Sequence, residues 1–191
     1  MMVPVNILGV HVERLSGAPI VLLSEVDDGR VLPIFVGPAE AQAILVGLQG
    51  LERPRPGTHD LLLAVLASME VELTAVDVTE LREGTFLAEL VLQTPDGEER
   101  VSARPSDALA LAVREDVPVQ VNQAVFDDAG IEVTHESDEP LGDEQIDDIV
   151  DEFRSFLASA TPTDFAEGLD EDAEPDRGDN DVDDGEPGDR G

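Results

Sequence analysis

The sequence contains no cysteine, no lysine, no tyrosine and no tryptophan. The absence of cysteine excludes disulfides, thiolate chemistry and cysteine-ligated zinc. With six phenylalanines as its only aromatic residues, the sequence predicts no stacking platform of the kind that holds single-stranded nucleic acid. It also lacks a Gly-rich phosphate loop, a Gly-x-Ser-x-Gly motif and a His-Glu-x-x-His motif, so the enzyme classes built on these motifs have no support.

Long apolar runs are missing as well. No stretch approaches the ~18 apolar residues that a membrane span needs. Residues 1–6 lack the basic region and apolar core of a signal peptide, so we expect a cytoplasmic protein with no membrane partner. A length of 191 residues with 41% hydrophobic residues fits one globular domain with appendages.

Charge is the unusual quantity in this sequence. The formal net charge is −33, and all 11 basic residues are arginine. Residues 136–191 carry −19 of this charge and residues 1–135 carry −14. Such an acidic surface repels nucleic acid, so any function that involves nucleic acid has to overcome this repulsion.

Hydrophobic periodicity and turn residues predict an α+β fold. Strands are expected at residues 3–15, 20–23, 31–36, 71–81, 86–94, 100–103 and 117–121, and helices at 38–48, 58–69, 105–115, 123–129 and 143–160. The unbroken apolar run at 20–23 indicates a strand that is covered on both faces. Pro118 favours an edge position for the last strand, and Thr58 is a good N-cap for the second helix.

The composition divides the chain into three parts. Residues 1–135 are expected to form the domain, and residues 136–160 a linker and an amphipathic C-terminal helix. Residues 161–191 combine many acids with few large apolar side chains, which predicts a disordered acidic tail.

Two segments 67 residues apart share one pattern. Each reads strand, strand, strand and then a helix that begins Pro-x-acid-Ala-x-Ala, at residues 38–43 and 105–110. The pattern predicts mixed or antiparallel sheets built from two hairpin-plus-helix units. Internal duplication is one interpretation, and chance agreement among small and apolar residues is the other. In either case Glu40 and Asp107 occupy the same third helical position.

Two interpretations of Glu40 and Asp107 stay open. An acid at the third helical position can accept a hydrogen bond from the cap N–H and so stabilise the helix end. If the two helix starts converge, the same carboxylates could instead hold a Mg²⁺ or Mn²⁺ ion, or divide the work of general acid and general base.

Three further groups could take part in chemistry. His59, exposed in the first helical turn, suits proton transfer near neutral pH. The neighbouring Asp60 is either a favourable first-turn charge or a functional acid. No second histidine lies at metal-ligand spacing, so zinc has little support. Arg55 and Arg104 could bind phosphate through their planar guanidinium groups, or form ordinary surface salt bridges.

Several motifs resemble those of the bifunctional nuclease (BFN) domain family. They are Leu-Pro-Ile-Phe-Val-Gly at residues 32–37, Arg-Pro-Gly-Thr-His-Asp-Leu at 55–61, Gly-Thr-Phe at 84–86 and Arg-Pro-Ser-Asp-Ala-Leu-Ala-Leu-Ala at 104–112. The resemblance covers about residues 5–131. It implies an α+β domain that often forms a dimer, and a nuclease activity on DNA and RNA. Its motif positions mark as site residues Glu40, His59, Asp60, Arg104 and Asp107.

The first hypothesis is therefore a nuclease that hydrolyses phosphodiester bonds in DNA and RNA. Arg104, with Arg55 and Ser106, would bind the scissile phosphate. Acids from the set Glu40, Asp60 and Asp107 would serve in catalysis, with Glu40 and Asp107 as the ligands of a divalent cation, and His59 would move a proton. The alternatives are a non-enzymatic homodimeric module whose C-terminal helix and acidic tail recruit a protein partner, and a binder of a small anionic metabolite.

Overall fold

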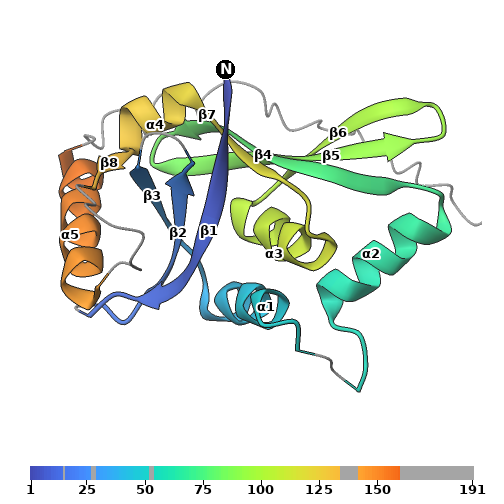
Figure 1. Ribbon diagram of the computed structural model, residues 1–191, viewed down its shortest axis with the longest axis horizontal. Helices are drawn as coiled ribbons and strands as arrows, with labels where there is room; N and C mark the ends of the chain where they lie inside the picture. Colours follow the sequence, from blue (N-terminus) through green and yellow to red (C-terminus); the bar gives the residue numbers. More distant parts are fainter. Residues whose placement is uncertain (15, 27–28, 52–53, 134–141, 160–191) are drawn as a thin grey trace, which may run out of the picture. The chain divides into compact units, whose positions relative to one another are not determined.

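The computed structural model describes residues 1–14, 16–26, 29–51, 54–133 and 142–159. Within these residues, eight strands form one mixed sheet and five helices pack around it (Figure 1). The α+β fold class is confirmed. The tail predicted at residues 161–191 lies outside the described residues. None of the described helices is both long enough and apolar enough to cross a membrane.

The observed strands and helices lie close to the ranges predicted from the sequence. The strands are β1 (Met2–Val12), β2 (Pro19–Glu25), β3 (Arg30–Phe35), β4 (Glu72–Arg82), β5 (Thr85–Thr94), β6 (Gly97–Ala103), β7 (Val119–Asn122) and β8 (Ile131–Glu132). The helices are α1 (Pro38–Leu48), α2 (Thr58–Ser68), α3 (Pro105–Glu115), α4 (Gln123–Ala129) and α5 (Asp143–Ser159).

The sheet consists of two similar halves on either side of β7. Its order is β6-β5-β4-β7-β1-β2-β3-β8, so β1–β3 and β4–β6 are each a three-stranded antiparallel meander. Helix α1 follows the first meander and α3 the second. The predicted pair of strand–strand–strand–helix units is thus present in the fold.

The edge position predicted for β7 is wrong. This strand lies at the centre, antiparallel to β1 and parallel to β4. Pro118 stands just before the strand, where its missing N–H breaks no ladder bond. Its carbonyl even supports the sheet, because it accepts a hydrogen bond of 3.0 Å from the Val76 N–H.

The core lies on both faces of β2 and β3. Residues 20–23 and 31–34 are buried without alternation, and successive side chains of a strand point to opposite faces. Both faces of the sheet are therefore covered here, as the apolar run predicted. Helix α1 contacts β1 and β2, while α5 contacts β3 and β8.

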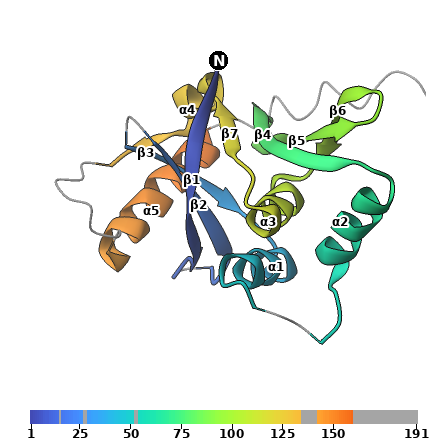
Figure 2. The same cartoon turned by 45° about the vertical axis from the view of Figure 1, so that its right-hand side comes forward.

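Helices α1 and α3 pack side by side and run in the same direction (Figures 1 and 2). Helix α3 is the most deeply buried helix of the described part, and residues 108–112 are at most 1% exposed. A Cβ atom at Gly47 would collide with the Val113 side chain, so the glycine permits the close approach of the two C-terminal ends. The two N-terminal ends consequently lie together as well.

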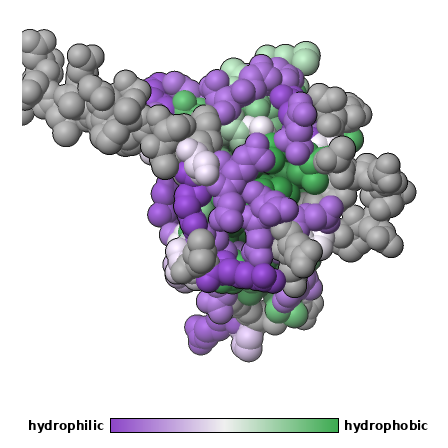
Figure 3. All heavy atoms as spheres, turned by 90° about the vertical axis from the view of Figure 1, so that its left-hand side faces the viewer, coloured by the Kyte–Doolittle hydropathy of each residue, from purple (hydrophilic) through white to green (hydrophobic). Residues whose placement is uncertain are grey.

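Helix α5 covers the outer end of the sheet beside β3. Its apolar stripe, formed by Ile146, Ile149, Val150 and Phe153, is buried. Ion pairs of Arg154 with Glu13 and of Arg14 with Asp147 tie the helix to the end of β1. Figure 3 views the molecule from this side and shows mostly hydrophilic residues on the surface. The stripe therefore packs against the domain, and the exposed residues of α5 whose side chains the structure describes are polar or acidic.

Candidate functional site

The N-termini of α1 and α3 meet at Arg104. The Arg104 guanidinium lies 3.2 Å from Glu40 Oε1 through Nη1, and its Nε donates to Asp107 Oδ2 at 2.7 Å. A second bond, from Nη2 to Asp107 Oδ1, measures 3.3 Å. The two acids that the sequence placed at equivalent helix positions therefore share one arginine.

The start of α2 joins the same cluster through His59. Its Nε2 atom lies 3.3 Å from Asp107 Oδ1, and the side chain is largely buried, with 16% exposed. His59 sits on the face of α2 that carries Leu63 and Leu66, which pack against the core. One chain of contacts thus runs from Glu40 through Arg104 and Asp107 to His59. We call these four residues the helix-start cluster.

The hydrogen bonds of Glu40, Asp107 and Asp60 show which of these acids cap a helix. Among the described residues, neither Glu40 nor Asp107 accepts a hydrogen bond from a backbone N–H, so the capping interpretation does not hold for them. It does hold for Asp60, whose Oδ2 accepts from the Gly57 N–H at 2.7 Å. The predicted N-cap at Thr58 is wrong by one residue: Gly57 is the cap, and the Asp60 side chain closes back on it.

Asp60 belongs to a neighbouring contact rather than to the helix-start cluster. Its Oδ1 atom accepts a 2.6 Å bond from Arg114 Nε, and Arg114 also donates to the Ala110 carbonyl. The sequence analysis missed Arg114. Arg114 lies seven residues after Asp107, which places it two turns along the same face of α3. This spacing could have identified Arg114 from the sequence. Asp60 fixes the start of α2 and in this way holds His59.

The remaining predicted phosphate ligands differ in their surroundings. Ser106 is 8% exposed, and its hydroxyl has no hydrogen-bond partner among the described residues. Arg55 is exposed in the loop before α2 and makes no ion pair or hydrogen bond within the described part of the chain. The structure therefore places Ser106 beside the cluster, whereas Arg55 has no ion-pair or hydrogen-bond partner among the described residues.

Contacts within the cluster stabilise the charged forms of Asp107 and Arg104. Partial burial alone would raise the pKa of Asp107, but hydrogen bonds from Arg104 and His59 outweigh this effect and hold the pKa below its ordinary value. The bond to Asp107 in turn raises the pKa of Arg104, with a smaller contribution from Glu40. At neutral pH the cluster thus contains the charged forms of Asp107 and Arg104, together with the side chains of Glu40 and His59.

A divalent cation does not fit the two carboxylates as they are placed. Arg104 occupies the position between Glu40 and Asp107 that a shared cation would take. Within the described residues, no three His, Cys, Asp or Glu side chains come together closely enough to hold a metal ion. The Mg²⁺ or Mn²⁺ ion stays a prediction from the sequence.

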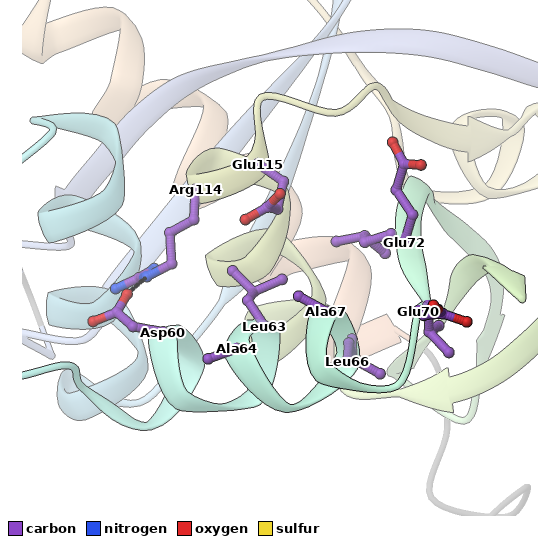
Figure 4. A pocket seen from close by; sticks show the side chains of 11 residues that line it. Asp60, Leu63, Ala64, Leu66, Ala67, Glu70, Glu72, Arg114 and Glu115 are labelled. Carbon is purple, nitrogen blue, oxygen red and sulfur yellow. Dashed lines mark hydrogen bonds and ion pairs between the residues drawn. The ribbon is translucent and has the colours of Figure 1, made fainter.

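A large pocket among the described residues lies between α2, α3 and β4. Its volume is about 860 Å³, and the Asp60–Arg114 pair closes one end (Figure 4). Acidic side chains on its wall include Glu70, Glu72 and Glu115. Since its only arginine is already paired with Asp60, this pocket is unsuited to a phosphate group.

A smaller pocket of about 360 Å³ adjoins the helix-start cluster. Glu40, Arg104 and Ser106 line it together with Phe35, Phe86 and Phe153. The sequence analysis predicted no aromatic platform, yet three of the six phenylalanines meet here. They come from β3, β5 and α5, and their wide separation along the chain left no local signal.

These features describe an α+β protein with a histidine–acid–arginine cluster at facing helix starts, next to an apolar pocket. The bifunctional nuclease domain matches residues 21–134 of the chain. The chain belongs to this family, which confirms the resemblance seen in its motifs. All four residues of the helix-start cluster fall within the matched segment.

Relatives fall into two groups. An uncharacterised protein of Mycobacterium tuberculosis is 42% identical over 161 residues, which is 84% of this chain and 96% of that protein. Bifunctional nuclease 1 of Arabidopsis thaliana is 30% identical over 132 residues, 67% of this chain and 41% of the plant protein. Bifunctional nuclease 1 of Oryza sativa subsp. japonica is 29% identical over 117 residues, 60% of this chain and 35% of that protein. The chain thus spans less than half of each plant nuclease.

We predict that Gly37→Ala displaces Glu40 from Arg104 at little cost to stability. Gly37 has an ordinary extended conformation, but a Cβ there would collide with the Glu40 carboxylate, the mobile end of a long side chain. Gly142→Ala is the matched control, since Gly142 also precedes a helix and its Cβ would make only a 3.7 Å contact. Both variants should lose about 1 kcal/mol or less. Crystal structures should show the Glu40–Arg104 contact broken only in Gly37→Ala, and an intact contact there would contradict the prediction.

The lowered pKa of Asp107 predicts a pH-dependent stability. A depressed folded-state pKa adds stability above the ordinary value of 3.8, and this stability is lost as the pH falls through the folded-state pKa. Wild type should therefore exceed Asp107→Asn in stability most at neutral pH, with the difference shrinking below about pH 4. Urea unfolding across this range measures it. Asp128→Asn, at an exposed acid, is the control, and a difference that stays constant with pH would refute the expectation.

Proposed function

We propose that this protein is a nuclease that hydrolyses phosphodiester bonds in DNA and RNA. The observation that carries the proposal is the helix-start cluster, in which an imidazole, a carboxylate and an exposed guanidinium lie in one line of contacts. Membership of the bifunctional nuclease domain family supports the reaction class. The printed names of the plant relatives support it as well.

Arg104 is suited to hold the scissile phosphate. Its side chain is 66% exposed. A guanidinium has five N–H donors, and three of them face carboxylates here, which leaves two for phosphate oxygens. The hydroxyl of Ser106, which has no partner among the described residues, lines the same pocket and can donate to a third oxygen. We propose that these groups orient the phosphorus for attack by water.

His59 is suited to move the proton. When Nε2 carries its hydrogen and donates to Asp107, Nδ1 is left as the acceptor. Nδ1 then takes a proton from the attacking water while the new P–O bond forms and the ester P–O bond breaks. The leaving oxygen takes up a proton from solvent or from the imidazolium. In this scheme Asp107 orients the imidazole, Glu40 steadies Arg104, and Asp60 positions the start of α2.

Electrostatics set the conditions for binding. Of the arginines in the described residues, all but Arg55 are paired with acids. Long-range attraction of nucleic acid is therefore weak, and binding depends on local contacts at the cluster. This fits a substrate bound through one phosphate and one or two nucleotides better than a duplex gripped along its length.

Cleavage of single-stranded DNA and RNA tests the proposal. We expect Arg104→Ala to lower the rate by at least about 100-fold, and His59→Gln to lower it by about 10²- to 10⁴-fold. The double variant Asp107→Asn with Glu40→Gln should also lose cleavage, and all three variants should remain folded at the assay temperature. Parallel reactions with Mg²⁺, with Mn²⁺ and with a chelator test the cation requirement.

Arg82→Ala is the matched control for Arg104→Ala. Arg82 is 64% exposed and makes two hydrogen bonds to Glu80, as Arg104 does to Asp107. It should cleave like wild type. Equal cleavage by every preparation would indicate a contaminating nuclease and would favour the non-enzymatic module.

We also propose that the protein forms a homodimer through α2. No residue of this helix is buried, and one face exposes Leu61, Leu62, Val65 and Met69. An apolar face of this kind in an acidic protein marks an interaction surface. A second copy suits it, because the face itself carries no charge that would repel its equivalent.

Light scattering coupled to size exclusion tests the dimer. Wild type should have about twice the 20.4 kDa mass of the chain, and Leu62→Asp should be a monomer because the new charge would be buried without a partner. Leu8→Asp, at a similarly exposed leucine of β1, is the control and should remain a dimer. A monomeric wild type, or a dimeric Leu62→Asp, would contradict this assembly.

A further inference from the structure

The pocket beside the helix-start cluster has an aromatic wall. Phe153 of α5 is stacked between two other rings, with centroids 6.0 Å from both Phe35 and Phe86 and interplanar angles of 22° and 19°. Phe86 and Phe153 are buried, whereas Phe35 at the end of β3 is 36% exposed. Phe35 thus presents an aromatic ring to the pocket, and the other two rings support it.

A polar part of the lining forms the second wall. Arg104 and Ser106, at the start of α3, belong to it together with Glu40, and the Ser106 hydroxyl has no hydrogen-bond partner among the described residues. A ligand that satisfies both walls needs an anionic group next to a flat apolar group. A volume of about 360 Å³ is at the small end of the range for ligand pockets. These requirements fit a single nucleotide.

Part of the aromatic wall lies outside the family domain. Phe153 belongs to α5, beyond the segment 21–134 that matches the family. The buried neighbours Ile149 and Val150, and the ion pair between Arg154 and Glu13, fix α5 against the domain. The stack around Phe35 is therefore completed by a helix that the family domain alone does not supply.

We propose that this pocket is a nucleobase subsite, in which a base stacks on Phe35 while its phosphate binds Arg104 and Ser106. The inference deepens the proposed nuclease function, since it assigns the nucleotide next to the scissile phosphate to this pocket. Stacking tolerates every base because each has a π face. The subsite therefore favours nucleotides over other phosphates without selecting one base.

Binding of small ligands to the full chain tests the subsite. The probes are adenosine 5′-monophosphate, ribose 5-phosphate, which has the same phosphate but no base, and inorganic phosphate, all at one fixed ionic strength. By calorimetry the nucleotide should bind wild type at least about 10-fold more tightly than ribose 5-phosphate. Phe35→Ala should abolish this preference, and Arg104→Ala should weaken both ligands. Because Phe35 is 36% exposed, its replacement should lower the melting temperature only moderately and leave the variant folded.

An introduced tryptophan gives an independent signal. The chain has no tryptophan or tyrosine, so Phe35→Trp carries the only indole, and the stacked base should quench its fluorescence. Val101→Trp, at an exposed position of β6, is the control and should not respond. Equal affinity for nucleotide and ribose 5-phosphate, or an unchanged preference in Phe35→Ala, would overturn the subsite.

The binding test of the subsite can succeed or fail independently of the cleavage test of the nuclease. None of the probes contains a phosphodiester bond, so binding is measured without cleavage. A base preference in a protein that cleaves nothing would retain the subsite and remove the nuclease. Cleavage without a base preference would retain the nuclease and remove the subsite.

Discussion

The parallel packing of α1 against α3 is the contact on which the rest of the site depends. The missing side chain at Gly47 and the small residues of α3 let the helices approach closely. Because both helices run in the same direction, their positive N-terminal ends lie together. That would be unfavourable without compensation, and Glu40 and Asp107 supply it. Arg104 then bridges the two acids, so this one helix contact brings together three of the four cluster residues, and α2 adds His59.

Local features of the site could be predicted from sequence, whereas its long-range contacts could not. A proline at the first helical position and an acid at the third located the starts of α1 and α3, because both signals act within one turn. Whether those starts face each other depends on packing between residues more than sixty positions apart. The gathering of Phe35, Phe86 and Phe153 has the same origin. β7 was misplaced because Pro118 was counted inside the strand rather than before it.

The two carboxylates around Arg104 determine which anions the site can favour. A phosphate that approaches Arg104 meets a guanidinium already balanced by two carboxylates. In the proposed binding mode the phosphate therefore joins two carboxylates on one guanidinium rather than filling an empty cationic site. Small inorganic anions should gain little from such a site, because they bring charge and no apolar surface. A ligand that also buries a flat ring in the neighbouring pocket gains a second contribution.

The central position of β7 has a consequence for how the chain folds. β1 and β4 belong to separate meanders and are joined in the sheet only by this four-residue strand, which comes later in the sequence than either. Each meander can pair its own strands locally, but the continuous sheet has to wait for residues 119–122. Because β1 and β7 pair Met2 with Asn122, this contact closes a long loop. We therefore expect the pairing of β7 with β1 to form late in folding, after the local hairpins of each meander.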